Sequence, residues 1–280
     1  MSPQKRLQSE RRDQRGGQKD FHRETPRRRS LGGDQIEGRQ AVRELLLARK
    51  RTVEYVWIEE SVQRKGIVSE IADLCLSRRV PLLTMSHRRF DQGARSESHQ
   101  GVLARAAALR DIGLDELVEA SPEPFLVLVD GITDPHNLGA VLRSAELAGV
   151  TGVVLPQNRT SLITPTVAKA AAGAIEHLDF SLVSGIPSAL LMLREAGFSS
   201  IGLDVRGKGS VYSIPQEATS RVAVVLGSED KGIARLSAER CDLLVRIPQL
   251  GKLDSLNVSA AAAIAFFELS RLRTAHSTSN

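Results

Sequence analysis

Cysteine is scarce in this sequence, and long apolar runs are missing. The chain has two cysteines, Cys75 and Cys241, outside any CxxC pair, which provides no disulfide framework and is typical of a reducing compartment. No uncharged apolar run reaches the roughly 18 to 20 residues that span a bilayer, and the N-terminus is charged where a signal peptide would be apolar. We therefore expect a cytoplasmic protein with no membrane segment and two buried, structural thiols.

Several ligand-binding signatures are also absent. The glycines at 227 and 232 are not followed by Lys and Ser or Thr as in a Walker A loop, and no GxGxxG motif follows a predicted strand. These absences disfavour a nucleotide-dependent oxidoreductase or an NTPase. The histidines lack Cys or acidic neighbours at metal-ligand spacing, so we expect no metal site. They are His22, His87, His99, His136, His177 and His276.

Positive charge is concentrated at the N-terminus. Residues 1–30 contain ten Lys or Arg and four acidic residues, whereas the whole chain has a net charge of +5. With almost no apolar residue to bury, residues 1–35 are predicted to be a disordered basic arm. Its natural partner is a polyanion, because Lys and Arg gain affinity by neutralising phosphates. A solvated leader without a role is the alternative.

The rest of the chain is predicted to form two α/β units. Residues 36–110 alternate helical and strand patterns, among them GRQAVRELLLAR and TVEYVWIEE. A connector at 111–123 precedes the second unit at 124–274, and a tail follows at 275–280. In the second unit, apolar runs bounded by turns, such as FLVLVD and RVAVVLG, predict a parallel sheet covered on both faces. Ligands bind at the carboxyl ends of such strands, so the polar residues there matter most.

Two polar clusters follow predicted strands of this sheet. After FLVLVD, Asn137 is expected to cap a helix, and Arg143 lies off the apolar stripe of that helix. Such a guanidinium is suited to binding a phosphate, although a solvated helix arginine is the alternative. After VVLG, the turn that begins at Gly227 exposes backbone amides, and Glu229 either orients a hydroxyl group or caps the next helix.

A third cluster precedes an alanine-rich helix. Ser255 or Asn257 can cap this helix, which leaves the other side chain free to bind a ligand. The alanines at 260–263 remove bulk, so that backbone elements can approach closely. Such a thin helix is typical of a crowded pocket or a tight subunit contact, and a buried core helix is the alternative.

Together, three segments resemble the motifs of the SpoU (TrmH) family of AdoMet-dependent RNA ribose 2′-O-methyltransferases: DGITDPHNLGAVLRSAELAG, VLGSEDKGI and IPQLGKLDSLNVSAAAAIAFFE. Upstream, EGRQAVRELL and SHQGVLA are similar to the small substrate-binding domain of the branch that methylates a guanosine of 23S rRNA. The resemblance implies an α/β fold in which a small substrate-binding domain precedes a parallel SPOUT-type sheet with a C-terminal trefoil knot. It also implies a homodimer whose site lies near the subunit interface.

The same resemblance implies roles for particular residues. Gly227, Ile247 and Leu256 would hold the adenosine end of AdoMet, the expected cofactor. By the resemblance, Arg143 would activate the ribose 2′-OH, a role that includes acting as its base. Because deprotonating a guanidinium near neutral pH is costly, we favour a clamp on the substrate phosphate that helps to polarise the hydroxyl, and the final proton acceptor stays open. The residues that fix the ribose and this arginine would be Asn137, Glu229, Ser255 and Asn257.

Two positions depart from the family pattern. Gln249 stands where Met is frequent, and Asp254 stands where Ser or Glu is more usual. Neither departure affects a residue expected to take part in chemistry. A tRNA 2′-O-methyltransferase and a non-catalytic, RNA-binding ribosome assembly factor are the alternative functions.

Overall fold

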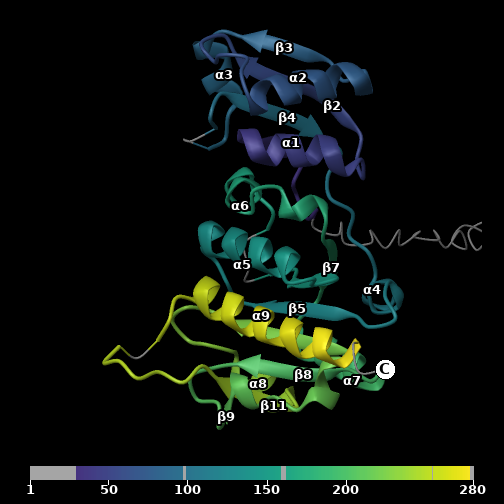
Figure 1. Ribbon diagram of the computed structural model, residues 1–280, viewed down its shortest axis with the longest axis vertical. Helices are drawn as coiled ribbons and strands as arrows, with labels where there is room; N and C mark the ends of the chain where they lie inside the picture. The colour runs from purple at the N-terminus through teal and green to yellow at the C-terminus, as the bar shows by residue number, and fades with distance from the viewer. Residues whose placement is uncertain (1–29, 97–98, 159–161, 254, 278–280) are drawn as a thin grey trace, which may run out of the picture.

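The computed structural model describes residues 30–96, 99–158, 162–253 and 255–277, which form two β-sheets stacked along the long axis (Figure 1). Most of the predicted arm lies outside these residues, and so do Asp254 and the last part of the tail. Residues 30–35, however, belong to the folded body, since Leu31 is buried and Gly33 N donates a 2.7 Å hydrogen bond to Ile163 O. The predicted end of the arm at residue 35 is therefore wrong. One apolar residue and a backbone pairing, which the charge pattern does not reveal, attach this segment to the fold.

The N-terminal unit is a four-stranded mixed sheet with helices packed on it. The strand order is β1-β4-β2-β3, in which β4 is antiparallel to β1 and β2 while β3 is parallel to β2. Val56 and Ile58 alternate with half-buried Tyr55 and Trp57 along β2, and they join a core that includes Ile71. The elements are β1 (Gln35–Glu37), α1 (Arg39–Ala48), β2 (Val53–Glu59), α2 (Ile67–Arg78), β3 (Leu82–Met85), α3 (His87–Gly93) and β4 (Val102–Ala106).

The C-terminal unit is built on a seven-stranded parallel sheet. Its strand order is β7-β6-β5-β10-β8-β11-β9, and every pairing in it is parallel. The strands are β5 (Phe125–Asp130), β6 (Gly152–Pro156), β7 (Asp179–Val183), β8 (Ser199–Leu203), β9 (Gly209–Ser210), β10 (Val222–Gly227) and β11 (Leu243–Arg246). The helical segments are α4 (Leu114–Glu119), α5 (Pro135–Leu147), α6 (Pro165–Ala170), η1 (Ala174–Glu176), α7 (Ile186–Glu195), η2 (Val211–Ser213), η3 (Gln216–Thr219), α8 (Arg235–Arg240) and α9 (Val258–Ser277).

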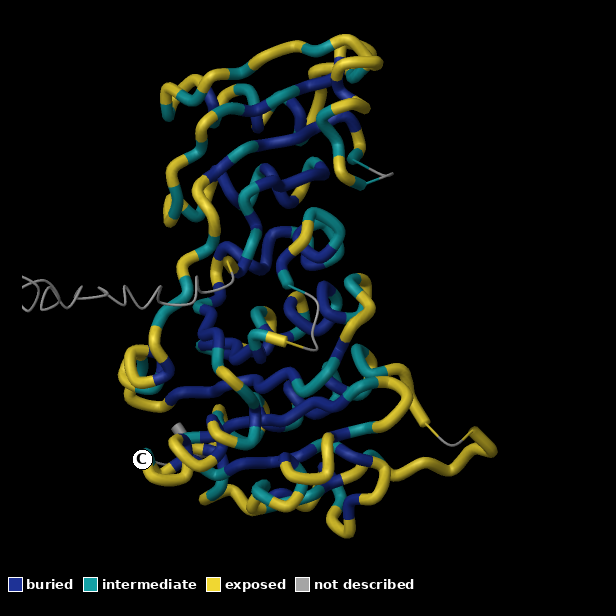
Figure 2. Tube along the Cα trace, turned by 180° about the vertical axis from the view of Figure 1, so that it is seen from behind, coloured by how far each residue is buried: buried dark blue, intermediate teal, exposed yellow. Residues whose placement is uncertain are grey.

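Both faces of this sheet are covered, as its continuous apolar strands predict. Along β5, Val127 and Val129 face the core that α5 and α9 complete, whereas Leu126 and Leu128 face the core that α4 and α7 complete. Because side chains alternate between the faces of a strand, a strand buried on both sides must be apolar throughout. Buried stretches of the chain lie along the centre of the molecule in both sheet units (Figure 2).

Helix α9 lies across α5, and small residues form much of its buried face. Ala262 and Ala265 are buried together with Phe266, whose ring meets that of Phe125 edge to face at 6.1 Å between centroids. Alanine permits close packing here, which is the core interpretation of the alanine-rich segment. Among the described residues no helix is both long and apolar enough to cross a bilayer.

The predicted connector at 111–123 is packed rather than extended. It contains α4, whose Leu117 is fully buried, and Asp111 accepts a 2.8 Å hydrogen bond from Leu182 N. The prediction of a plain linker therefore missed a short helix. Asp115, Glu116 and Glu119 are exposed, while Leu114 and Leu117 pack into the core beneath the sheet.

The two cysteines differ in their surroundings. Cys75 is buried, as predicted, whereas Cys241 is only partly buried at the end of α8. Burial raises the pKa of the Cys75 thiol to about 11 and that of Cys241 to about 12. Both thiols are therefore protonated and weakly reactive at neutral pH.

A buried ion pair joins the two sheet units. Arg51, which follows α1, donates through Nε to Glu176 Oε2 at 2.9 Å, and its Nη2 contacts the other carboxylate oxygen. Its Nη1 donates to Gly33 O at 2.6 Å and to Ala107 O at 2.7 Å. The side chains of Arg51 and Glu176 are only 6% and 1% exposed. One apolar core also extends through both units, so the two units are connected by apolar packing as well as by the ion pair.

Replacing Arg51 by alanine is expected to lower the free energy of unfolding by about 3 to 5 kcal/mol, because it leaves the Glu176 carboxylate buried without a partner. Urea unfolding followed by circular dichroism measures this loss. Arg110→Ala is the control, since its pair with Glu116 is exposed and should contribute at most about 1 kcal/mol. Equal losses in the two variants would contradict the assignment.

Candidate functional site

A cavity of about 370 Å³ lies at the carboxyl ends of β8, β10 and β11. Its lining comes from segments 203–206, 226–232 and 246–261, which are far apart in the sequence. Its volume is within the range of small-molecule sites, and its place in the sheet is where parallel folds bind ligands. The loop between β11 and α9 projects from the body beside it (Figure 1).

Gly227 and the turn after it form one wall of this cavity. Ser228 N donates to Gly232 O at 3.1 Å and Gly232 N returns a bond to Ser228 O at 2.9 Å, which closes a tight loop around Glu229. A Cβ atom on Gly227 would overlap the carbonyl carbon of Gly232 and the amide nitrogen of Ile233. Only glycine fits at this position, because the returning backbone passes directly against it.

Three predicted side chains form a hydrogen-bonded chain next to the cavity. Asn137 Nδ2 donates to Glu229 Oε1 at 2.8 Å, and Asn257 Nδ2 donates to Asn137 Oδ1 at 2.9 Å. The residues come from α5, the turn after β10 and the start of α9, and they lie 92 and 120 residues apart in these pairs. The structure therefore brings together three of the residues that the sequence singled out, although they are far apart along the chain.

The helix caps around this chain differ partly from expectation. Asp134, not Asn137, caps α5, since its Oδ1 accepts from His136 N at 2.9 Å. The predicted cap was wrong because α5 begins at Pro135, which places Asn137 inside the first turn and frees its amide for Glu229. Asn257 does cap α9, as its Oδ1 accepts from Ser259 N at 2.9 Å.

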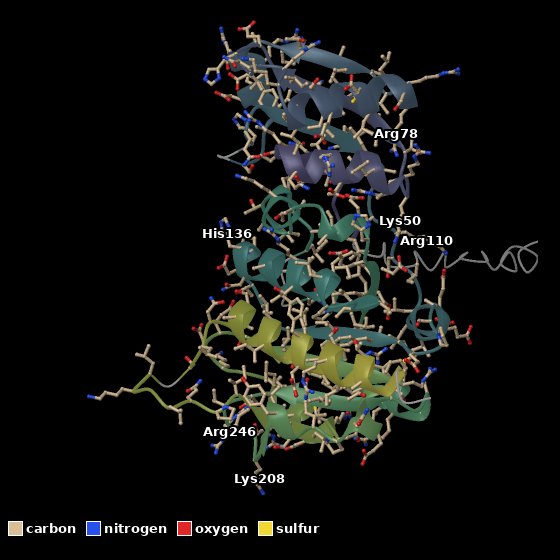
Figure 3. The ribbon with its side chains drawn as sticks, viewed as in Figure 1. Lys50, Arg78, Arg110, His136, Lys208 and Arg246 are labelled. Carbon is tan, nitrogen blue, oxygen red and sulfur yellow. The ribbon has the colours of Figure 1, made fainter. Side chains whose placement is uncertain are left out.

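The remaining predicted residues are divided between the cavity and the surface. Ile247, Leu256 and Ser255 line the cavity, as Gly227 and Glu229 do. Arg143 does not line it, but lies exposed on α5 with no hydrogen-bond or ion-pair partner among the described residues. His136 and Arg246 lie on the side from which the loop after β11 projects (Figure 3).

The sequence-based prediction missed several charged residues of the cavity, among them Asp204 and Arg206. Asp204 directly follows β8, and its side chain is 2% exposed. Its carboxylate accepts hydrogen bonds from Arg206 Nε at 2.8 Å, Arg206 Nη2 at 2.7 Å and Ile233 N at 3.2 Å. Hydrogen bonds from Arg206 hold the pKa of Asp204 below its usual value, against the opposing effect of burial. A charged residue immediately after an apolar strand was the available signal.

The low pKa of Asp204 makes its contribution to stability dependent on pH. A carboxylate whose pKa is lower in the folded state stabilises the fold above its unfolded pKa, about 3.9, and loses this effect as pH falls through the folded pKa. Asp204→Asn should therefore lower the thermal midpoint most near neutral pH and progressively less below about pH 4. A deficit that stays constant from neutral to strongly acidic pH would contradict this assignment.

The arrangement suits positioning of a polar ligand beside a bound small molecule. The cavity combines apolar and charged side chains, and the hydrogen-bonded amides and carboxylate at its edge can donate hydrogen bonds to hydroxyl groups and accept them. The described residues contain no group of three His, Cys, Asp or Glu able to hold a metal ion.

Comparison with known proteins identifies the class to which this fold and site belong. The SpoU rRNA Methylase family matches residues 124–267, and the domain described as RNA 2′-O ribose methyltransferase substrate binding matches residues 35–111. The solved structure of the SpoU methyltransferase AviRb from Streptomyces viridochromogenes, in complex with the cofactor AdoMet, superposes with a TM-score of 0.71. It is 20% identical and covers 86% of this chain and 90% of its own.

Two curated relatives carry a more specific name. The 23S rRNA (guanosine-2′-O-)-methyltransferase RlmB of Pseudomonas putida is 35% identical over 244 residues, which are 86% of this chain and 97% of the relative. RlmB of Pseudomonas syringae pv. tomato is 36% identical over 246 residues, with the same coverage. The chain belongs to the SpoU rRNA methylase family, and the predicted resemblance is confirmed.

Proposed function

We propose that the protein transfers a methyl group from AdoMet to a ribose 2′-OH in RNA, and that the target is a guanosine of 23S rRNA. The observation that carries the proposal is the convergence of Asn137, Glu229 and Asn257 at the edge of a cavity walled by the Gly227 turn. The names of both RlmB relatives support the choice of RNA and nucleoside. The 2′-OH is also the group that distinguishes RNA from DNA.

The cavity would hold AdoMet, which supplies an electrophilic methyl group when bound. Gly227, Ile247 and Leu256 would contact its adenosine end, because all three line the cavity and offer small or apolar surface. Glycine at 227 lets the turn pack directly against the strand end, which keeps this wall of the cavity in place. Alignment of a nucleophile in such a site can lower a barrier by about 7 to 11 kcal/mol.

The hydrogen-bonded chain of Asn257, Asn137 and Glu229 would position the ribose. Asn137 is held by both Glu229 and Asn257, so its amide has one orientation. Glu229 retains a second carboxylate oxygen that can accept a hydrogen bond from a ribose hydroxyl, and Ser255 lies on the same cavity. Arg143 would clamp a phosphate of the substrate and help to polarise the 2′-OH by its charge.

The homodimer and the knot are part of this proposal. Arg143 shares the exposed side of α5 with Leu147, which is 64% exposed, and Phe267 of α9 is 50% exposed. Burial of this apolar surface against a second copy would favour association. Because Arg143 does not line the cavity of its own chain, the dimer would bring it to the cavity of the partner.

The trefoil knot would lie where the loop before α9 enters the cavity wall.

The remaining parts of the chain have proposed roles as well. Residues 36–110 would be the substrate-binding domain, 124–274 the methyltransferase domain and 111–123 the segment that joins them, which the two family matches support. The basic N-terminal segment would add nonspecific attraction to rRNA. We place the reaction in the cytoplasm, where ribosomal RNA is available.

Incubation with labelled AdoMet and either rRNA or tRNA tests the function. We expect ribose methylation of 23S rRNA, and mass-spectrometric mapping should place it on one guanosine. Methylation of tRNA alone would reassign the substrate. Binding of AdoMet without methylation of either RNA would favour an assembly factor, and absence of both activities would refute the proposal.

A further inference from the structure

Arg206 has a guanidinium group that is fixed in orientation yet open to solvent. Its Nε and Nη2 atoms bond the two oxygens of Asp204, at 2.8 and 2.7 Å, and Nη2 also donates to Ile233 O at 3.1 Å. The Arg206 side chain is nevertheless 60% exposed, whereas that of Asp204 is 2% exposed. A buried carboxylate thus holds one edge of the guanidinium and leaves the other edge at the surface.

The free edge of Arg206 is available to a ligand in the cavity. Within the described part of the chain, Nη1 of Arg206 has no hydrogen-bond acceptor, although both Arg206 and Asp204 line the cavity. The Nε hydrogen and both Nη2 hydrogens are used by Asp204 and Ile233, so Nη1 keeps two N–H groups that can donate to the oxygens of a carboxylate or a phosphate. The geometry therefore predicts an anionic group opposite Nη1.

Arg206 is better prepared for this role than the other cations of the cavity. Lys231 and Arg246 also line it, but both are exposed, and within the described ranges no carboxylate pairs with either side chain. Ordering such flexible side chains costs conformational entropy on binding. The pairing with Asp204 has already ordered Arg206, so less freedom remains to be lost.

We propose that Arg206 binds the amino-acid carboxylate of AdoMet, and that Asp204 is the positioning residue that orients it. This inference rests on the proposed function and deepens it. The adenosine part of AdoMet is uncharged, and the carboxylate is its only anionic group. Gly232 lies between Gly227 and Arg206: its backbone packs against Gly227, and a Cβ atom on Gly232 would lie 3.6 Å from Arg206 Nη2. The adenosine and the carboxylate would therefore bind to neighbouring parts of the same cavity wall.

Two ligands that differ in the amino-acid part test this assignment by isothermal titration calorimetry. S-adenosylhomocysteine keeps the carboxylate, whereas 5′-methylthioadenosine lacks the whole amino-acid part. Arg206→Gln should weaken the affinity for S-adenosylhomocysteine by about 10- to 100-fold, the size of one charged hydrogen-bonded contact. The affinity for 5′-methylthioadenosine should stay within about twofold of wild type, because that ligand does not reach Arg206.

Arg194→Gln is the matched control. Arg194 pairs with Asp242 at 3.1 Å and donates to a backbone carbonyl, as Arg206 does, but it does not line the cavity. This variant should bind both ligands as wild type does. Thermal midpoints of both variants verify that they are folded.

The possible outcomes separate this inference from the proposed function. If wild type binds S-adenosylhomocysteine but Arg206→Gln loses both ligands equally, Arg206 only shapes the cavity and the assignment is overturned. Unchanged affinity for both ligands overturns it too, and a loss confined to RNA affinity would assign Nη1 to a substrate phosphate. If wild type binds neither ligand, the proposed function itself fails.

Discussion

Arg143→Ala is expected to reduce methyl transfer to 23S rRNA by about 10²- to 10³-fold, the usual cost of removing one group that stabilises developing charge. The fold should be unaffected, because Arg143 is exposed and no described residue pairs with it. Affinity for S-adenosylhomocysteine should also be unchanged, since Arg143 does not line the cavity of its own chain. Single-turnover methylation and calorimetry measure the two quantities separately.

Mixing two inactive variants tests whether Arg143 acts across the dimer. Asn257→Ala disables the polar chain, and Arg143→Ala disables only the clamp. If Arg143 serves the partner's cavity, a heterodimer of the two variants contains one cavity with both defects and one with neither. At equal ratio under random exchange about half of all dimers are mixed, so substantial activity should return. No recovery after verified subunit exchange would place Arg143 at its own cavity. Arg271→Ala, on the exposed side of α9, is the arginine control.

Gly227→Ala is expected to abolish measurable binding of AdoMet and S-adenosylhomocysteine, with at least about a 100-fold loss of affinity. The new methyl group would overlap the backbone of Gly232 and Ile233, so the turn must move outward and the cavity wall with it. The same displacement would separate Glu229 from Asn137. Calorimetry measures the affinity.

Gly251→Ala is the control for that substitution. Gly251 lies in the loop between β11 and α9, and a Cβ atom there meets nothing within 4 Å. Its φ is not in the left-handed region, so alanine is tolerated. Wild-type affinity in Gly227→Ala, or an equal loss in both variants, would contradict the role of Gly227 as the cavity wall.

The pattern of apolar strands and turns predicted the catalytic half of the fold well. Strands such as β5 and β10 are apolar on both faces, which identifies a covered parallel sheet, and in such a sheet all the carboxyl ends lie at one edge. That geometry is why Asn137, Glu229 and Asn257 could be expected to meet although they are far apart in the sequence.

Features that depend on single long-range contacts were not predictable in the same way. Arg51 and Glu176 lie 125 residues apart, and each resembles an ordinary surface residue in its local pattern. Asp204 directly follows β8, and its role as an anchor depends on a contact with Ile233 from another turn. Local sequence patterns predict helices, strands and their buried faces, whereas a contact between two distant side chains depends on the fold of the whole chain.

The joint at Arg51 and Glu176 has a consequence for the choice of nucleotide. A buried pair inside a shared core connects the N-terminal sheet to the sheet that carries the cavity. If the N-terminal sheet binds RNA, as we propose, this joint would set the distance from that RNA to the cavity, and a folded RNA would present the ribose that lies at this distance. If the target nucleotide is selected by its distance from the N-terminal sheet, the cavity needs no side chain that recognises the base. Disrupting the Arg51–Glu176 pair should then spread methylation to neighbouring nucleotides.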